Sequence, residues 1–126
     1  MAQLILHLVG DYLLQSGWMA NNKSKSSLAA GVHALTYSLP FLILRPSLAA
    51  WLVIFITHFF IDRYALARHV AVVKNYLAPK RHWLKKDNIS QFGYCKKTPD
   101  FLAIWLLIIT DNTLHLTINY LALKYL

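Results

Sequence analysis

The stretch Trp51-Leu-Val-Ile-Phe-Ile-Thr-His58-Phe-Phe-Ile-Asp62-Arg63 is apolar almost all the way around a helix, apart from one histidine and one aspartate near its end. A surface helix of a soluble protein would instead keep one whole face polar. With its neighbours, the stretch covers residues 47–67. This meets the roughly 20 helical residues needed to cross a hydrocarbon core about 30 Å thick. We therefore predict a membrane-spanning helix here.

Three further hydrophobic stretches accompany it, at approximately residues 2–19, 28–44 and 101–123. The first two are short but within the usual range of membrane helices. Of the 126 residues, 57% are apolar and only 14% are charged, too few charges for the polar shell of a soluble domain. The sequence predicts an all-α fold, a four-helix transmembrane bundle forming a single integral membrane domain over residues 1–126. A soluble four-helix bundle is the alternative.

The basic residues are segregated along the chain. The net charge is +8, and eight of the thirteen Lys and Arg residues fall between Arg68 and Lys97. Basic loops stay in the cytosol, so we expect this segment and the loop with Lys23 and Lys25 to be cytosolic and both termini to lie outside. Residues 70–86 are either an interfacial helix against anionic headgroups or a solvated loop. No nucleic-acid-binding fold accompanies the charge, so we expect no nucleic-acid partner.

Ionisable residues occur inside the hydrophobic stretches. The chain has no glutamate and five aspartates, three of which lie in these stretches, each four residues from a histidine. The pairs are His7 with Asp11, His58 with Asp62, and Asp111 with His115. A separation of four places both side chains on one helical face, and His33 joins them from the second stretch. Because ionisable groups inside a membrane are costly, they indicate a functional site.

The order of residues within the pairs predicts that they meet. Histidine precedes aspartate in the first and third stretches, and aspartate precedes histidine in the fourth, which runs in the opposite direction. Each aspartate therefore lies on the cytosolic side of its histidine. His33 enters its helix from the same side. We expect a layer of carboxylates next to a layer of imidazoles.

Imidazole and carboxylate together are good ligands for Zn²⁺, Mn²⁺ or Fe²⁺. One or two such ions would offset the repulsion between three carboxylates. The predicted metal ligands are His7, Asp11, His33, His58, Asp62, Asp111 and His115. A metal with an open coordination position makes water a nucleophile near neutral pH. This predicts metal-assisted hydrolysis, with the three aspartates as candidate catalytic groups and one of them as a general base.

Other polar residues have candidate roles. Arg63 is positioned to bind an anionic headgroup or phosphate of the substrate. Asn119 continues the stripe of the fourth stretch, and Tyr37 lies one turn from His33; both are either donors that orient the ligands or partners in helix–helix hydrogen bonds. Gly10 would let another helix approach closely beside the site.

The same ionisable groups admit two other interpretations. Asp–His pairs could simply hold the helices together, although interhelical polar contacts in membranes contribute only about 0.6 kcal/mol on average. Chains of aspartate and histidine also mark proton and cation pathways. Both alternatives remain open on the sequence alone.

The motifs resemble a known family. The stretch from His7-Leu-Val-Gly-Asp11 to Lys23, His33, His58-Phe-Phe-Ile-Asp62-Arg63 and Asp111-Asn-Thr-Leu-His115 resemble domain-of-unknown-function family 3307, small multi-pass membrane proteins of bacteria and phages. The resemblance implies a multi-pass protein of the bacterial inner membrane and supplies no activity. The family pattern is expected to have glutamine where Asn112 stands. A looser likeness is to membrane-bound metal-dependent hydrolases.

We therefore expect a membrane-embedded metal-dependent hydrolase acting on a lipid, a phosphoester or another membrane-associated substrate. Its expected partners are membrane lipids and anionic headgroups at the basic loop, and a homodimer would shield its polar faces. The alternative is a non-enzymatic membrane protein, either a proton or metal-ion conductor or a phage factor that binds a host membrane protein.

Overall fold

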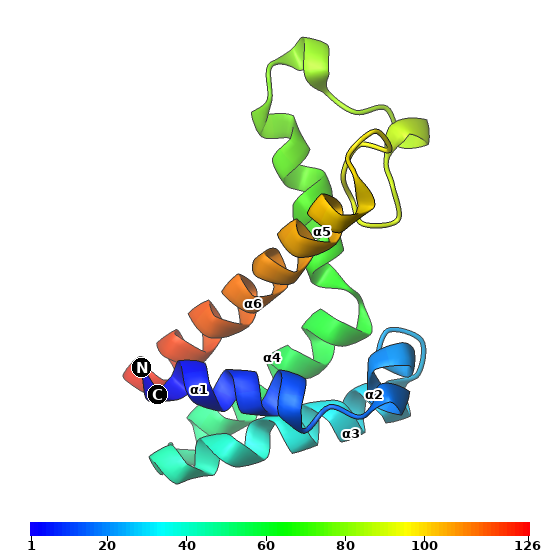
Figure 1. Cartoon of the computed structure of the whole chain (residues 1–126). Helices are drawn as coiled ribbons and strands as arrows, with labels where there is room; N and C mark the ends of the chain where they lie inside the picture. Colours follow the sequence, from blue (N-terminus) through cyan, green and yellow to red (C-terminus); the bar gives the residue numbers. More distant parts are fainter. The chain divides into compact units, whose positions relative to one another are not determined.

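The regular elements of the chain are all helices, which confirms the all-α class. The structure is a computed structural model that describes every residue, Met1–Leu126. Its contacts form two compact units, one of Met1–Ala65 with Leu114–Leu126 and one of Leu66–Thr113. The long helix α6 (Asp100–Tyr125) contributes to both units (Figure 1).

Six helical segments precede Tyr64 in the first unit. They are α1 (Ala2–Leu8), the π-helix η1 (Val9–Leu13), α2 (Gly17–Asn22), α3 (Ser27–Ser38), the 3₁₀-helix η2 (Leu39–Leu44) and α4 (Leu48–Arg63). Serines begin the two long ones, because a serine side chain accepts a hydrogen bond from an otherwise unpaired N–H of the first turn. Ser26 Oγ accepts from Ala29 N at 3.4 Å, and Ser47 Oγ accepts from Ala50 N at 3.0 Å.

Residues 2–19 do not form one continuous helix. Helix α1 runs directly into η1, the chain leaves the helical path after Leu14, and α2 starts afresh behind Ser16. Ser16 Oγ accepts a hydrogen bond from Met19 N at 3.3 Å. The pair Ser16-Gly17 thus ends one helix and caps the next, since serine competes for backbone hydrogen bonds and glycine has weak helical preference.

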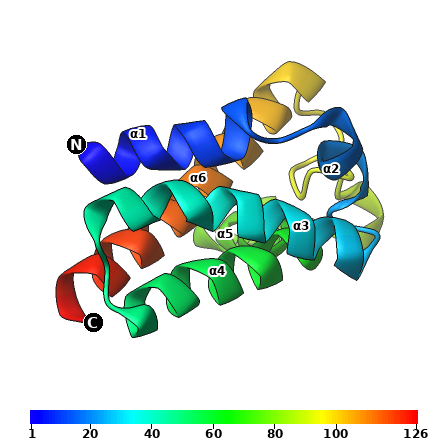
Figure 2. The ribbon, with the colours of Figure 1, turned by 90° about the horizontal axis from the view of Figure 1, so that it is seen from below.

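Helices α1, α3 and α4 lie side by side in the first unit (Figure 2). Their apolar contacts centre on Tyr37, Phe41 and Ile54, all fully buried, with Leu6, Ala50 and Ala122 around them. Trp51 adds a cross-link between α4 and α3 by donating from Nε1 to Ser38 O at 3.1 Å. The core of this unit therefore reaches from the first helix to the last turns of α6.

The ends of the helices in this unit alternate. Both chain termini and the turn between η2 and α4 lie at one end, and α2 lies at the other (Figure 2). The turn contains Arg45 in the left-handed region, with φ of 51°. The Lys23–Lys25 turn that follows α2 is thus separated from the termini and from Arg45 by the length of the helices.

The third hydrophobic stretch is interrupted before its expected end at residue 67. Helix α4 stops at Arg63, and Ala65 adopts a left-handed conformation with φ of 49°. That conformation is costly for a residue with a Cβ and ends the regular ladder of helical hydrogen bonds. Helix α5 (Leu66–Lys74) begins immediately afterwards.

The second unit contains α5, the short 3₁₀-helices η3 (Asn75–Leu77), η4 (Lys80–His82) and η5 (Lys86–Asn88), and the first part of α6. Ala71, Tyr94 and Ala103 form its apolar centre. Gly93, with φ of 84°, receives a hydrogen bond on its carbonyl from Asn75 Nδ2 at 2.8 Å. Residues 70–86 therefore do not form one continuous helix: α5 and η3 end at Leu77, Pro79 has no N–H to donate, and only the short 3₁₀-helix η4 follows before Lys86.

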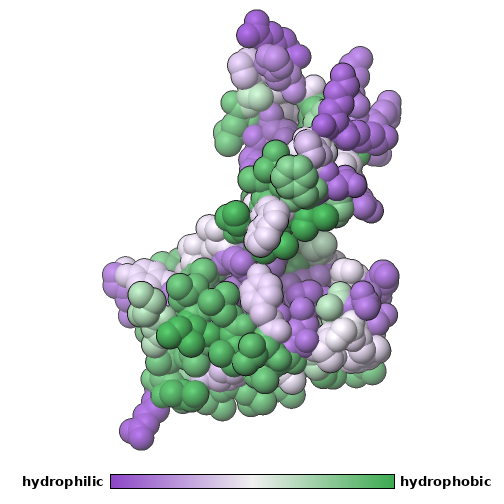
Figure 3. All heavy atoms as spheres, in the orientation of Figure 1, coloured by the Kyte–Doolittle hydropathy of each residue, from purple (hydrophilic) through white to green (hydrophobic).

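Two helical segments are long and apolar enough to cross a membrane, Ser27–Leu44 and Asp100–Tyr125. A third is reached only if Leu48–Arg63 and Leu66–Leu77 are counted as one span. Helix length and composition therefore support membrane spans without establishing all four. The drawn face of the first unit carries a broad hydrophobic area, whereas hydrophilic side chains gather over the segment between α5 and α6 (Figure 3). Exposed apolar surface of this extent marks a place of contact with a membrane or with another protein.

Candidate metal centre

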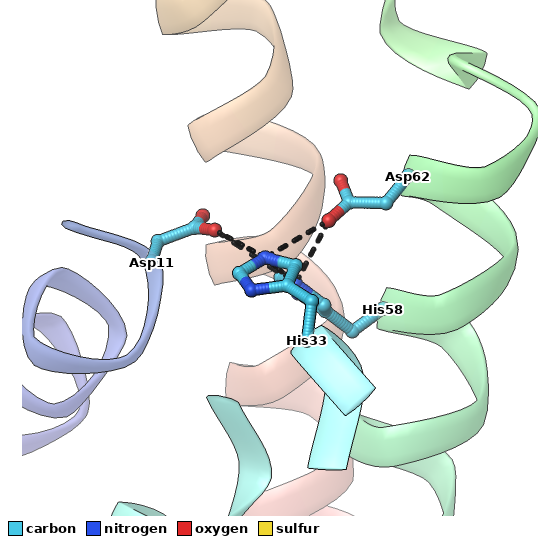
Figure 4. A group of neighbouring side chains, drawn as sticks. All are labelled: Asp11, His33, His58 and Asp62. Carbon is cyan, nitrogen blue, oxygen red and sulfur yellow. Dashed lines mark hydrogen bonds and ion pairs between the residues drawn. The ribbon is translucent and has the colours of Figure 1, made fainter. Parts of the chain in front are cut away.

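Four ionisable side chains of the first unit point toward one another. Asp11 comes from η1, His33 from α3, and His58 and Asp62 from α4 (Figure 4). One ligand atom from each of the four lies within 4.8 Å of all the others, and all four residues are buried. This group can hold a metal ion.

The separations of these atoms match a coordination shell. His33 Nε2 lies 3.1 Å from Asp11 Oδ1 and 3.1 Å from Asp62 Oδ2. His58 Nε2 lies 3.1 Å from Asp62 Oδ2 and 3.8 Å from Asp11 Oδ1, and the two Nε2 atoms are 3.0 Å apart. Bonds of about 2.1 Å from a tetrahedral zinc ion place its ligands about 3.4 Å from one another. The observed values bracket that distance.

Hydrogen bonding alone does not account for the convergence. A neutral imidazole carries one ring N–H, and a carboxylate carries none. Yet His33 Nε2 faces two carboxylate oxygens and a second imidazole nitrogen, all within 3.1 Å. The single hydrogen on His33 Nε2 cannot satisfy all three of these atoms, which lie in different directions. A cation at their centre would satisfy all of them.

Local backbone structure places the carboxylates. His58 and Asp62 are one turn apart on α4, as their spacing predicts. Asp11 lies in the π-helix η1. Segments of this type are rare in proteins as a whole, but many of those that occur lie at functional sites. Gly10 makes the close approach to α3 possible, because a Cβ there would lie 2.7 Å from Tyr37 Cδ2 and 2.9 Å from Tyr37 O.

Tyr37 connects one side of the group to its surroundings. Its hydroxyl lies 2.8 Å from His7 Nδ1 and accepts a hydrogen bond from Asn119 Nδ2 at 2.6 Å. His7 Nε2 in turn lies 3.8 Å from Asp11 Oδ2, the carboxylate oxygen that does not face His33. His7 is therefore placed to orient Asp11 from behind, as supporting groups do around metal ligands.

His115 occupies the corresponding position beside Asp62. Its Nδ1 lies 3.1 Å from His58 Nδ1, and its Nε2 lies 3.5 Å from Asp62 Oδ1. His115 thus contacts the atoms of His58 and Asp62 that face away from the group of four. Its placement suits a residue that orients two ligands.

Lys23 also reaches the site. Its Nζ lies 3.0 Å from Asp62 Oδ2, 3.8 Å from Asp11 Oδ1 and 3.4 Å from His33 Nε2. From the sequence Lys23 is identifiable only as a cytosolic loop charge, because no helical spacing relates it to the His–Asp pairs. Its position at the end of the motif that begins with His7 is the one signal that points to it.

Six of the seven predicted ligands lie in or next to the group of four. Asp11, His33, His58 and Asp62 are brought together, and His7 and His115 lie directly beside them. Asp111 is half-buried on α6, one turn before His115, and belongs to the second unit.

Arg63, the predicted substrate residue, is engaged with the turn that carries Lys23. Its Nη1 donates to Ser24 O at 2.9 Å, and its Nε donates to Ser27 Oγ at 3.1 Å. Its guanidinium also lies over the Tyr64 ring, 5.5 Å from the centroid. These contacts fix the turn, and contact with a substrate remains a prediction.

Nearly the whole chain matches one family model. Residues 1–124 match the family described as "Protein of unknown function (DUF3307)". No curated protein and no solved structure is significantly similar to the chain.

Proposed function

The chain belongs to the DUF3307 family, whose description gives no activity, and we propose from the geometry of its site that it is a membrane-embedded metal-dependent hydrolase. Its substrate is a lipid, a phosphoester or another membrane-associated molecule. One divalent ion, Zn²⁺ or otherwise Mn²⁺ or Fe²⁺, binds among Asp11, His33, His58 and Asp62. The observation that carries the proposal is that these four side chains, from three helical elements, present ligand atoms within 4.8 Å of one another.

The distances favour three of the four as ligands. The facing atoms of His33, His58 and Asp62 are 3.0–3.1 Å from one another. Asp11 is equally close to His33 but stands 3.8 Å from His58. Catalytic zinc sites use three protein ligands and leave the fourth position to water or substrate. Two histidines and one carboxylate fit this pattern.

Asp11 is then available as the general base. Its Oδ1 lies at the edge of the group, where a water in the open position would be within hydrogen-bonding reach. An ion in this site would supply a water nucleophile by lowering its pKa toward ~7. His7 Nε2 lies 3.8 Å from Asp11 Oδ2, on the side of this carboxylate away from His33.

Membrane location supports an apolar or amphiphilic substrate. We propose four spans in the bacterial inner membrane with both termini outside, which agrees with the alternating helix ends of the first unit. A groove of about 250 Å³ is lined by Gly31, Phe55, Ile56, Phe59 and Phe60. No polar side chain lines this groove, so it is suited to contact with an acyl chain and not to catalysis. We propose that hydrolysis takes place at the buried His/Asp group.

Elemental analysis and hydrolysis assays of purified full-length protein test the proposal. Wild type should contain about one equivalent of Zn, Mn or Fe and should hydrolyse at least one of p-nitrophenyl phosphate, bis(p-nitrophenyl) phosphate or a short-chain phospholipid. The His58→Ala, Asp62→Ala double variant should lose both metal and turnover. The exposed pair His69→Ala, Asp87→Ala is the matched control and should keep both. A wild-type protein that takes up no metal would overturn the proposal.

A second candidate function rests on a chain of imidazoles. His33 Nε2 lies 3.0 Å from His58 Nε2, and His58 Nδ1 lies 3.1 Å from His115 Nδ1. Such a chain suits a proton or cation pathway. Flux of protons or metal ions in liposomes that is abolished by Asp11→Asn, with no hydrolysis by wild type, would establish conduction in place of catalysis.

A further inference from the structure

Lys23 is more exposed than the charged groups that it contacts in the site. Its side chain is 21% exposed, whereas those of Asp11 and Asp62 are 5% and 3% exposed. The ammonium therefore lies between the two carboxylates and solvent. A ligand that approaches the buried group from this side meets Lys23 first.

The turn that carries Lys23 is fixed, although its side chain is long. Lys23 N donates to Met19 O at 2.8 Å. Arg63 Nη1 and Nε donate to Ser24 O and Ser27 Oγ just beyond it. The flexible four-carbon stem of lysine lets the ammonium move while the backbone stays in place. Lys23 can therefore change partners without a change of fold.

Lys23 and a metal ion would compete for the same oxygen. Asp62 Oδ2 lies 3.0 Å from Lys23 Nζ and 3.1 Å from both His33 Nε2 and His58 Nε2. A divalent ion bound to this oxygen would repel the ammonium at such short range. Occupation of the site by metal would thus release Lys23 toward the exposed side.

The charges then favour an anion. A bound divalent ion and the Lys23 ammonium would be two cations next to each other at the more exposed side of the site, and both attract a negatively charged ligand. Lysine is a common binder of phosphate, which it contacts as a point charge.

We infer that Lys23 binds the phosphate group of the substrate once the metal site is filled, and that it competes with the metal for Asp62 before then. This rests on the proposed function and narrows its substrate to a phosphate-bearing molecule. Competition with the metal and binding of phosphate predict opposite effects of removing the Lys23 ammonium. Without it, the affinity for metal should rise and the affinity for phosphate should fall.

Calorimetric titrations of the full-length protein in detergent test the inference. Zn²⁺ is titrated into metal-free protein, and inorganic phosphate or a short-chain phosphatidic acid is titrated into zinc-loaded protein. Lys23→Met should bind zinc about fivefold more tightly or better, and phosphate about tenfold more weakly or worse, as expected for loss of a charge-assisted hydrogen bond. Lys25→Met, at an exposed position in the same turn, should match wild type in both titrations.

The possible outcomes separate the two proposals. Failure of wild type to bind Zn²⁺, and also Mn²⁺ and Fe²⁺ titrated in its place, overturns the metal site itself. If zinc binds normally, then absence of phosphate binding, unchanged phosphate affinity in Lys23→Met, or a parallel loss of both affinities overturns the role of Lys23. Binding of inorganic phosphate as tight as that of phosphatidic acid indicates a soluble phosphate compound, and tighter binding of phosphatidic acid indicates a lipid headgroup. Either result supports the inference.

Discussion

The phenol ring of Tyr37 stacks on the imidazole ring of His58, with centroids 3.5 Å apart and 15° between the ring planes. The same tyrosine is fully buried in the apolar core and bonds through its hydroxyl to His7 and Asn119. Tyr37 therefore belongs both to the apolar core of the first unit and to the surroundings of the candidate metal centre. A substitution of Tyr37 should change both the stability of the protein and its affinity for metal.

Tyr37→Phe should lower the free energy of unfolding by about 1–3 kcal/mol, because the buried Asn119 amide loses its acceptor. The stacked ring remains, so the unit should still fold. Metal affinity should fall about 10- to 100-fold, since His7 loses a contact that orients it behind Asp11. Denaturant titration and metal titration measure the two effects. Tyr125→Phe, at an exposed position, is the control, and equal behaviour of the two variants would contradict the role of Tyr37.

Asp62→Asn should abolish metal binding, with affinity reduced by more than the ~100-fold that loss of a supporting residue causes. An amide keeps the size of the side chain but removes the charge and one of the acceptor oxygens that face His33, His58 and Lys23. Asp87→Asn, on the exposed basic segment, changes net charge equally and should retain the metal. Metal content after dialysis measures the difference. Retention of metal by Asp62→Asn would remove Asp62 from the ligand set.

Gly10→Ala should destabilise the first unit by about 1–3 kcal/mol, the usual cost of excess volume in a packed interior. The added Cβ would meet the backbone of Tyr37 at 2.9 Å, and backbone cannot rotate away as a side chain can. Gly31→Ala has no atom within 4 Å of the added Cβ and lies inside α3, so it should stabilise by up to about 1 kcal/mol. Thermal unfolding compares the two. A Gly10→Ala protein as stable as wild type would show that η1 and α3 lie farther apart than the 2.9 Å contact of the added Cβ with Tyr37 O requires.

The proposed orientation predicts which surface residues face the outside. In a Cys95→Ser background, Lys97→Cys should resist a membrane-impermeant maleimide added to intact spheroplasts and react after lysis. Lys124→Cys should react before lysis. Both positions are exposed, so burial does not mask the result. Labelling of Lys97→Cys in intact spheroplasts would contradict the proposed topology and indicate the opposite orientation.

The positions of the helices follow from local sequence. Apolar length, the serine caps Ser26 and Ser47, and the helix-stopping Arg45-Pro46 are properties of neighbouring residues, so the first residues of α3 and α4 come close to expectation. The pairing of His58 with Asp62 is local in the same sense, because four residues make one turn. The family assignment is confirmed as well, since the motifs that carry it lie along the chain in order.

Only the tertiary structure showed that four of the seven predicted ligands form one group and that His7 and His115 lie directly beside it. Only it showed that Lys23 reaches Asp62, and that η1 and Ala65 interrupt the expected helices. Helical spacing fixes which side chains share a face, but not how far each helix is rotated about its axis or which helix that face meets. These are decided by the simultaneous packing of all side chains in the core, such as Tyr37 against Gly10 and His58.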